Sequence, residues 1–174
     1  MKVAVLNYTG SVGKTVAASH LLAPRMNGAQ IFAVESTNET GADLGLNVDQ
    51  LRGEHFGRLF RELLTREDAI VDVGASNIED FLTHMMRYEG AHEEMNYFVL
   101  PVINTGKAQR ETIKTVAALA ELGVDPERVR ILFNRVDSSV QDEFPSILAY
   151  AAKTGEVQAN PQAAIYENEV FELL

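Results

Sequence analysis

The sequence predicts an α/β fold, with a mostly parallel central sheet and helices on both of its faces. Short apolar runs alternate with helical patterns along the 174-residue chain. The runs are almost continuously apolar, as expected of strands that are covered on both faces of a parallel sheet. A hydrophobic content of 46% and a charged content of 23% are ordinary for a globular protein. We therefore expect one domain over residues 1–174.

Five apolar runs are predicted to form the strands of this sheet. Each is short and lies between segments with helical periodicity, which is the pattern of repeated strand–helix–strand units. Pro101 is expected to close the fourth run, and Asn134 marks the end of the fifth. The five runs cover residues 3–6, 31–34, 69–71, 97–100 and 129–133.

Two helices are predicted in the first half of the chain. The first covers residues 14–26, where Pro24 is expected to kink or end it and Asn27-Gly28 is a stop signal. The second is strongly amphipathic, because apolar residues recur at i, i+3, i+4, i+7 and i+8. Its predicted inner face consists of Phe56, Leu59, Phe60, Leu63 and Leu64.

Three further helices are predicted in the second half. One begins at Ser76 or Asn77, and the other two end before Gly123 and Gly155, after starting near residues 107 and 144. Residues 157–174 are expected to add a short strand and a last helix. The inner face of the first of these helices is predicted to consist of Ile78, Phe81, Leu82, Met85 and Met86.

Unusual polar residues gather where the predicted strands end. Parallel strands place their carboxyl ends along one rim of the sheet, and ligands of such sheets bind beyond that rim. The chain therefore predicts a ligand site built from five loops. These loops contain residues 10–15, 35–39, 72–76, 105–107 and 134–137.

The first of these loops has the features of a phosphate-binding P-loop. A strand precedes Gly10 and Gly13, and a helix follows Lys14 and Thr15. Glycines let backbone N–H groups converge on phosphate oxygens, and the helix N-terminus adds partial positive charge. An ordinary strand–helix turn is the alternative. The predicted phosphate-binding residues are Gly10, Ser11, Val12, Gly13, Lys14, Thr15 and Val16.

The same stretch resembles the deviant P-loop of the ParA/MinD family of partition ATPases. That family carries Lys-Gly-Gly-x-Gly-Lys-Thr after its first strand, and residues 9–15 read Thr-Gly-Ser-Val-Gly-Lys-Thr. Thr9 replaces the signature lysine and Ser11 replaces a glycine. The resemblance extends over about residues 1–137, including Pro101 and the helix that begins at Lys107. It implies a P-loop NTPase fold that binds ATP and Mg²⁺.

Asp72 is predicted to hold the magnesium ion. It follows the third strand, as a Walker B aspartate does, and holds the ion through water while the ion bridges the terminal phosphates. The Thr15 hydroxyl and Glu35 are the other predicted metal ligands. The alternative is an ordinary aspartate at a strand end or helix cap.

The loop after the second strand departs from the family pattern. The family carries Asp-x-Asp there, and the second aspartate positions or activates the attacking water. Those positions are Glu35 and Thr37 in this chain, and Thr37 cannot act as a carboxylate base. Glu39 is the expected substitute, so the predicted catalytic residues are Lys14, Glu39 and Asp72. We expect slow hydrolysis.

Asn134 and Arg135 occupy the position that recognises the base. The asparagine amide can bond a purine edge, and the guanidinium can stack on the ring. The family resemblance favours adenine. The spacing from Asn134 to Asp137 also resembles the guanine-reading signature of GTPases, and a simple strand-to-loop turn is a further alternative.

The net charge of −10 argues against a surface that binds nucleic acid broadly. One helix carries a compact basic stripe, formed by Lys107, Arg110 and Lys114. Within the family, residues 7–15 and 72–82 are most similar to the StbB subfamily of plasmid stability proteins. That similarity implies a nucleotide-dependent homodimer and a plasmid-encoded DNA-binding partner, with weak or indirect contact to DNA and a role in positioning or conjugative transfer.

The remaining composition favours a cytoplasmic protein, and the family resemblance implies association with the nucleoid through a partner. The chain has no cysteine, no apolar run long enough for a membrane span and no room for a signal peptide before the first strand. Two alternative functions stay open. One is a nucleotide-binding scaffold without efficient hydrolysis, and the other is a small-molecule ATP-dependent ligase on the same fold.

Overall fold

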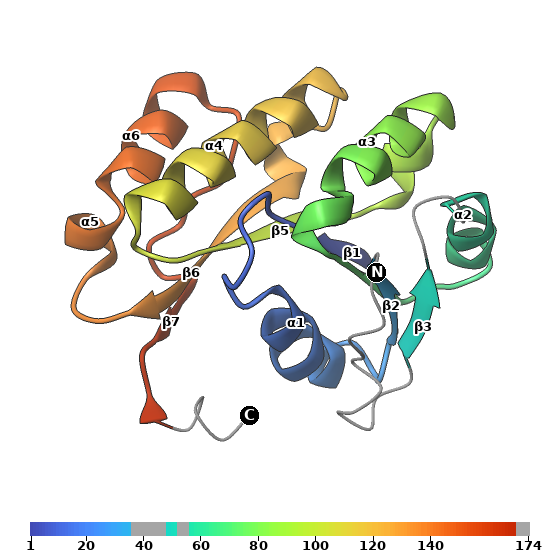
Figure 1. Cartoon of the computed structure of the whole chain (residues 1–174), viewed down its shortest axis with the longest axis horizontal. Coiled ribbons are helices and arrows are strands. Elements are labelled where there is room, and N and C mark those ends of the chain that lie inside the picture. Colours follow the sequence, from blue (N-terminus) through green and yellow to red (C-terminus); the bar gives the residue numbers. More distant parts are fainter. Residues whose placement is uncertain (36–47, 52–55, 170–174) are drawn as a thin grey trace.

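The computed structural model describes residues 1–35, 48–51 and 56–169. Its described strands form one seven-stranded sheet in which every pairing is parallel, in the order β3-β2-β4-β1-β5-β6-β7 (Figure 1). The strands are β1 (Lys2–Val5), β2 (Gln30–Val34), β3 (Val48–Leu51), β4 (Ala69–Val73), β5 (Tyr97–Val102), β6 (Val129–Val136) and β7 (Ala164–Tyr166). The predicted α/β class with a parallel sheet is confirmed.

Helical segments cover both faces of the sheet, and the two faces differ. One face carries the segment formed by α1 (Lys14–Val16), the π-helix η1 (Ala17–Leu22) and the 3-10 turn η2 (Ala23–Arg25), which packs on a small apolar cluster. The opposite face carries the larger core and the remaining long helices (Figure 1). These are α2 (Phe56–Leu64), α3 (Ile78–Arg87), α4 (Gly106–Glu121) and α6 (Pro145–Thr154).

Short helical turns complete the described connections. They are η5 (Ala75–Asn77), η6 (Ala91–Glu94), η7 (Pro126–Arg128) and the four-residue helix α5 (Val140–Glu143). The stop signals at two glycines are confirmed, since Gly123 (φ 87°) and Gly155 (φ 69°) have the left-handed backbone that follows a helix end.

The first helix differs from the single α-helix predicted over residues 14–26. Only its first turn is α-helical, and a π-helix follows. Ala17, Ala18 and Ser19 are the residues buried in that π-helix, so small side chains bring it close to the sheet. Pro24 lies at the start of the final 3-10 turn, where proline needs no hydrogen-bond partner for its nitrogen.

Three strands run past their predicted ends, since β4 continues through Asp72 to Val73. Pro101 lies inside β5, and Asn134 lies inside β6. β1 has already ended beside Pro101, whose carbonyl oxygen accepts a hydrogen bond from Asn7 Nδ2 at 2.9 Å. The N–H and C=O of one strand residue point to the same side of the strand. The N–H that Pro101 lacks would therefore point toward the β1 side, where the strand has ended, so no hydrogen bond between strands is lost.

One strand and one short α-helix were not predicted, and two apolar residues were placed on the wrong side. β3 contains Asp49, a residue type that is depleted in strands, and among the described strands it pairs only with β2. α5 is too short for a periodic pattern.

Leu64 and Met86, predicted to face the core, are 52% and 67% exposed. The predicted inner faces were too wide: one included the residue at i+8, and the other included two consecutive residues, which point in different directions on a helix. For the tail, β7 supplies the predicted short strand, while the last helix falls partly on residues 170–174, outside the described residues.

Candidate functional site

The P-loop lies at the carboxyl ends of two neighbouring central strands. β1 pairs with β4, and Val5 stands opposite Asp72 in the register. Residues of the loop, of the β2 end and of the β4 end enclose a cavity of about 380 Å³. Its lining residues are Gly10, Ser11, Gly13, Lys14, Thr15, Val16, Glu35, Gly74, Ala75 and Arg135. The structure therefore brings most of the predicted phosphate and metal residues together.

The backbone of the loop turns sharply before the helix. Ser11 (φ 58°) and Gly13 (φ 86°) are both left-handed, and Ala17 N donates to the Gly13 carbonyl at 2.9 Å to begin the helix. A Cβ atom on Gly13 would lie 2.4 Å from Asn134 Nδ2. Glycine is required here for the backbone angle and also for the space.

Lys14 is folded back onto the loop that contains it. Its Nζ donates to the carbonyl oxygens of Thr9 (2.9 Å) and Asn7 (3.2 Å), and the residue is only 8% exposed. Burial lowers the pKa of Lys14, while the nearby carboxylates of Asp72 and Glu35 act in the opposite direction. The amine is thus a desolvated cation at the cavity wall, where an anionic ligand would be strongly attracted.

Thr15 and Asp72 are joined by a hydrogen bond. The Thr15 hydroxyl donates to Asp72 Oδ2 at 2.7 Å, and Asp72 is 4% exposed. Burial raises the pKa of Asp72, and the Thr15 hydrogen bond and the Lys14 charge lower it. A hydroxyl and a carboxylate are the hard oxygen donors that suit Mg²⁺ beside phosphates.

Glu35, the third predicted metal ligand, lines the same cavity. No group of three or more His, Asp or Glu side chains in the described residues could hold a metal by itself, so phosphate and water would have to complete the coordination. Glu39 and Thr37 lie outside the described residues, and the predicted catalytic role of Glu39 stays a prediction.

Asn134 holds the phosphate loop in place. It is 9% exposed, and its Nδ2 donates to the Val12 carbonyl at 2.9 Å. The Val12 side chain is fully buried, so this residue can offer only its backbone to a ligand. Arg135 (φ 53°) is exposed and lines the cavity. Base recognition by Asn134 and Arg135 stays a prediction, and Asn134 has a positioning role that the sequence did not indicate.

Comparisons with known proteins were made by sequence and by structure. No family model matches the sequence, and no curated protein matches it. Solved structures do match. McdA from Cyanothece in complex with ATP is 16% identical with a TM-score of 0.61, and the match covers 99% of this chain and 85% of McdA. MinD from Pyrococcus horikoshii with Mg-ADP is 15% identical with a TM-score of 0.56, covering 99% and 83%.

A third solved structure is a putative plasmid partition protein from Borrelia burgdorferi B31 bound to AMPPNP. It is 11% identical with a TM-score of 0.58, and the match covers 99% of this chain and 87% of that protein. The chain has the fold of the ParA/MinD-type P-loop ATPases. At these identities the likeness establishes the fold, and the function has to be argued from the site.

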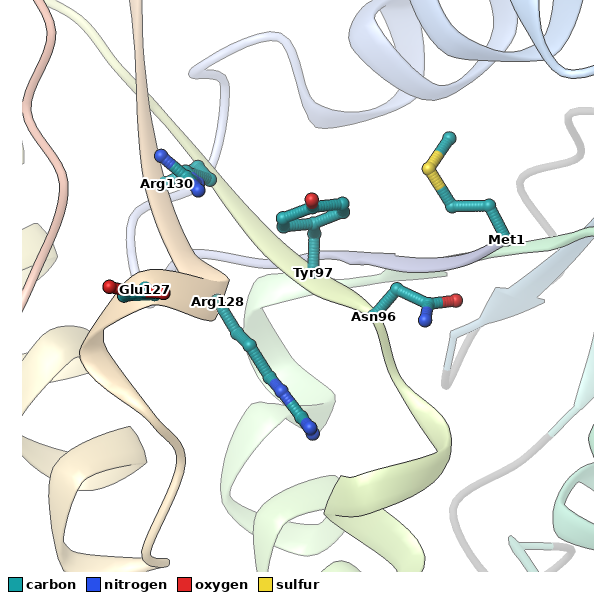
Figure 2. Close-up of a pocket in the computed structure, with 6 residues that line it drawn as sticks. All are labelled: Met1, Asn96, Tyr97, Glu127, Arg128 and Arg130. Carbon is teal, nitrogen blue, oxygen red and sulfur yellow. The ribbon is translucent and has the colours of Figure 1, made fainter.

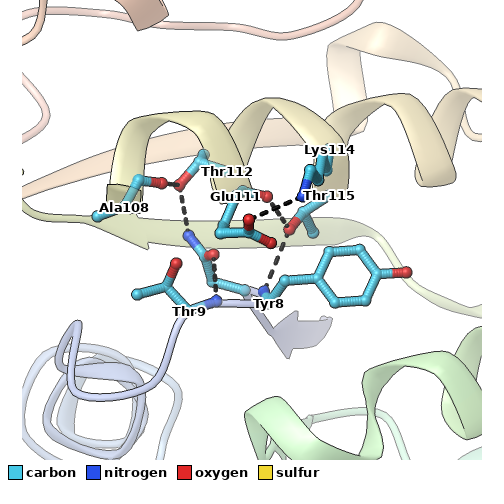
Figure 3. Close-up of polar contacts among 8 residues, drawn as sticks. Tyr8, Thr9, Ala108, Glu111, Thr112, Lys114 and Thr115 are labelled. Carbon is cyan, nitrogen blue, oxygen red and sulfur yellow. Dashed lines mark hydrogen bonds and ion pairs between the residues drawn. The ribbon is translucent and has the colours of Figure 1, made fainter. Parts of the chain in front are cut away.

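Within this ParA/MinD-type fold, a network that the sequence did not reveal fixes the segment before the P-loop (Figure 3). Buried Asn7 donates from Nδ2 to Thr112 Oγ1 at 2.6 Å, and the Tyr8 N–H donates to Thr115 Oγ1 at 3.2 Å. Both threonines also donate to carbonyls one turn earlier in α4. The sequence feature that could have indicated this network is the pair Thr112 and Thr115, two polar residues on the inner face of a predicted helix.

The loop after β6 is fixed by Glu143. Its carboxylate accepts backbone hydrogen bonds from Asp137, Ser138 and Ser139, and a side-chain bond from Asn104. The Ser138 bond is the largest of the causes that together lower the pKa of Glu143 to about 2. The carboxylate thus stays ionised across the physiological range and fixes the loop next to Arg135.

Proposed function

We propose that the chain binds ATP with Mg²⁺ in the P-loop cavity and works as a ParA-like switch. The observation that carries the proposal is that Lys14 and Thr15 line one cavity at the carboxyl ends of β1 and β4, where the Thr15 hydroxyl donates a hydrogen bond to Asp72. Backbone N–H groups of residues 10–16 bind the phosphates, and Lys14 binds their outer oxygens. Adenine lies against Asn134 and Arg135.

Magnesium is held by Thr15 and Asp72, with Glu35 nearby. The ion, when bound, neutralises charge on the terminal phosphates. Asp72 is already oriented for this role by the hydrogen bond from Thr15. Lys14 remains a donor toward the phosphates after it leaves the Asn7 and Thr9 carbonyls.

The switch acts in plasmid stability, segregation or positioning. A plasmid partition protein with AMPPNP is among the solved structures of this fold, and residues 7–15 and 72–82 are similar to the StbB subfamily. The chain forms a nucleotide-dependent homodimer and reaches DNA mainly through a plasmid-encoded DNA-binding partner. Conjugative transfer is a further process that this similarity suggests.

We expect ATP to bind better than GTP. Competition of unlabelled ATP and GTP against a fluorescent ATP analogue, with Mg²⁺ present, measures the preference. Removing Mg²⁺ with EDTA weakens binding if Thr15 and Asp72 hold the ion. Equal or stronger competition by GTP would show that Asn134 and Asp137 read guanine instead.

Hydrolysis by the isolated protein is expected to be slow. Thr37 replaces a carboxylate, and Thr9 is too short to reach across a dimer as the family lysine does. Single-turnover hydrolysis measures the rate, and Glu121→Gln, at an exposed position of α4, is the control. Glu39→Gln should slow the reaction without changing ATP affinity. Fast turnover by the parent protein, or an unaltered rate in Glu39→Gln, would contradict this assignment.

Direct binding to DNA is expected to be weak. Lys107, Arg110 and Lys114 are exposed on α4, but Lys114 is paired with Glu111 at 2.8 Å, and the chain carries a net charge of −10. A titration of duplex DNA with ATP, with and without the partner, measures the contribution of each. Tight binding without the partner that survives alanine at all three positions would show that the protein reaches DNA by another surface.

A further inference from the structure

A second cavity lies at the amino ends of the strands, opposite the carboxyl ends that hold the P-loop. It has a volume of about 490 Å³ and forms where β1, β5 and β6 begin (Figure 2). We call it the amino-edge pocket. Its lining residues are Met1, Asn96, Tyr97, Glu127, Arg128 and Arg130. The pocket shares β6 with the nucleotide site, since Arg130 and Asn134 lie toward opposite ends of that strand.

Two arginines give the amino-edge pocket a positive character in an acidic protein. Neither Arg128 nor Arg130 forms an ion pair within the part of the chain that the structure describes. The Arg130 guanidinium lies 5.4 Å from the centre of the Tyr97 ring, which orients it (Figure 2). By contrast, the amino group of Met1 is engaged by Asp68, so the arginines are the cations that a ligand would find.

The surroundings favour a compact anion over an extended one. Guanidinium forks bind carboxylates through two parallel hydrogen bonds, and the exposed Tyr97 ring offers an apolar surface beside them. Glu127 also lines the pocket, and the whole chain carries −10, so a long polyanion such as nucleic acid would be repelled beyond the pocket. A short segment with a few carboxylates avoids that repulsion.

We propose that the amino-edge pocket binds an acidic peptide segment of a partner protein, whose carboxylates pair with Arg130 beside the Tyr97 ring and with Arg128, whose side chain extends away from that ring (Figure 2). The pocket is separate from the P-loop, so a partner held there leaves the nucleotide cavity open. The chain thereby has a nucleotide site at the carboxyl ends of its strands and a site for a protein partner at their amino ends.

Fluorescence anisotropy with a labelled peptide of alternating aspartate and glutamate tests the proposal. The peptide should bind, and its asparagine–glutamine counterpart should not. Arg128→Gln and Arg130→Gln should each weaken binding about tenfold, the cost of a lost charge-assisted contact. Arg130→Lys should restore only part of the affinity, because lysine lacks the fork. Arg87→Gln, an exposed arginine on α3, is the matched control.

Two results would overturn the proposal. One is peptide binding that is unchanged in the Arg128→Gln/Arg130→Gln double variant, with folding checked by thermal melting. The other is stronger competition by an oligothymidylate of equal charge than by unlabelled peptide, which would assign the pocket to nucleic acid. Lys14→Ala should bind the peptide like the parent, so the outcome does not depend on whether the chain binds ATP.

Discussion

Gly13→Ala should lower the free energy of unfolding by about 2–3 kcal/mol and abolish most ATP binding. The left-handed backbone at φ 86° costs a residue with a Cβ about 1–2 kcal/mol. The new methyl group would also lie 2.4 Å from Asn134 Nδ2, and moving that amide breaks its hydrogen bond to the Val12 carbonyl, worth about 1 kcal/mol. Denaturant unfolding and ATP titration measure the two effects.

Gly10→Ala is the matched control for this substitution. In the part of the chain that the structure describes, a Cβ on Gly10 meets no atom within 4 Å, so stability should change by less than about 0.5 kcal/mol. The Gly13→Ala/Asn134→Ala double variant isolates the steric part, and it should be more stable than the sum of the single effects predicts. If Gly13→Ala were as stable as Gly10→Ala, the proposed packing of Asn134 against the loop would be wrong.

Lys14→Ala should weaken Mg-ATP binding roughly tenfold or more, because one charge-assisted contact contributes about 1.5–3 kcal/mol. The side chain is buried beside the cavity, and among the described residues its Nζ donates to two backbone carbonyls, those of Asn7 and Thr9. The ammonium group can therefore bind a phosphate by exchanging these two hydrogen bonds for bonds to phosphate oxygens. Calorimetric titration of the parent and the variant gives the difference in affinity.

Lys107→Ala is the lysine control for that experiment, since Lys107 is exposed on α4. It should bind ATP like the parent. Circular dichroism establishes that Lys14→Ala is folded before its affinity is compared. Unchanged affinity in a folded Lys14→Ala protein would remove the P-loop assignment, and with it the proposed switch.

The sequence alone determined the α/β class and the principal residues of the P-loop cavity. Lys14 and Thr15 follow a buried strand and open a helix, and Asp72 lies near the carboxyl end of a second buried strand. Such strands read as apolar runs because both faces of the sheet are covered, and their carboxyl ends share one rim. That rule places Thr15 and Asp72, 57 positions apart in sequence, on the same rim, and their contact requires in addition that β1 and β4 are neighbours, which only the structure shows.

The tertiary structure alone decided how the site is held. Asn134 reaches Val12 across 122 positions, and Asn7 reaches Thr112 across 105, in contacts that depend on which strands and helices become neighbours. Pro101 remains in a strand because β1 ends beside it, and Met86 is exposed because the core covers only part of α3. Tyr97 meets Arg130 because β5 pairs with β6 in one register. Periodicity is local, whereas strand order and register arise from packing the whole chain, so these contacts have no signature in the sequence.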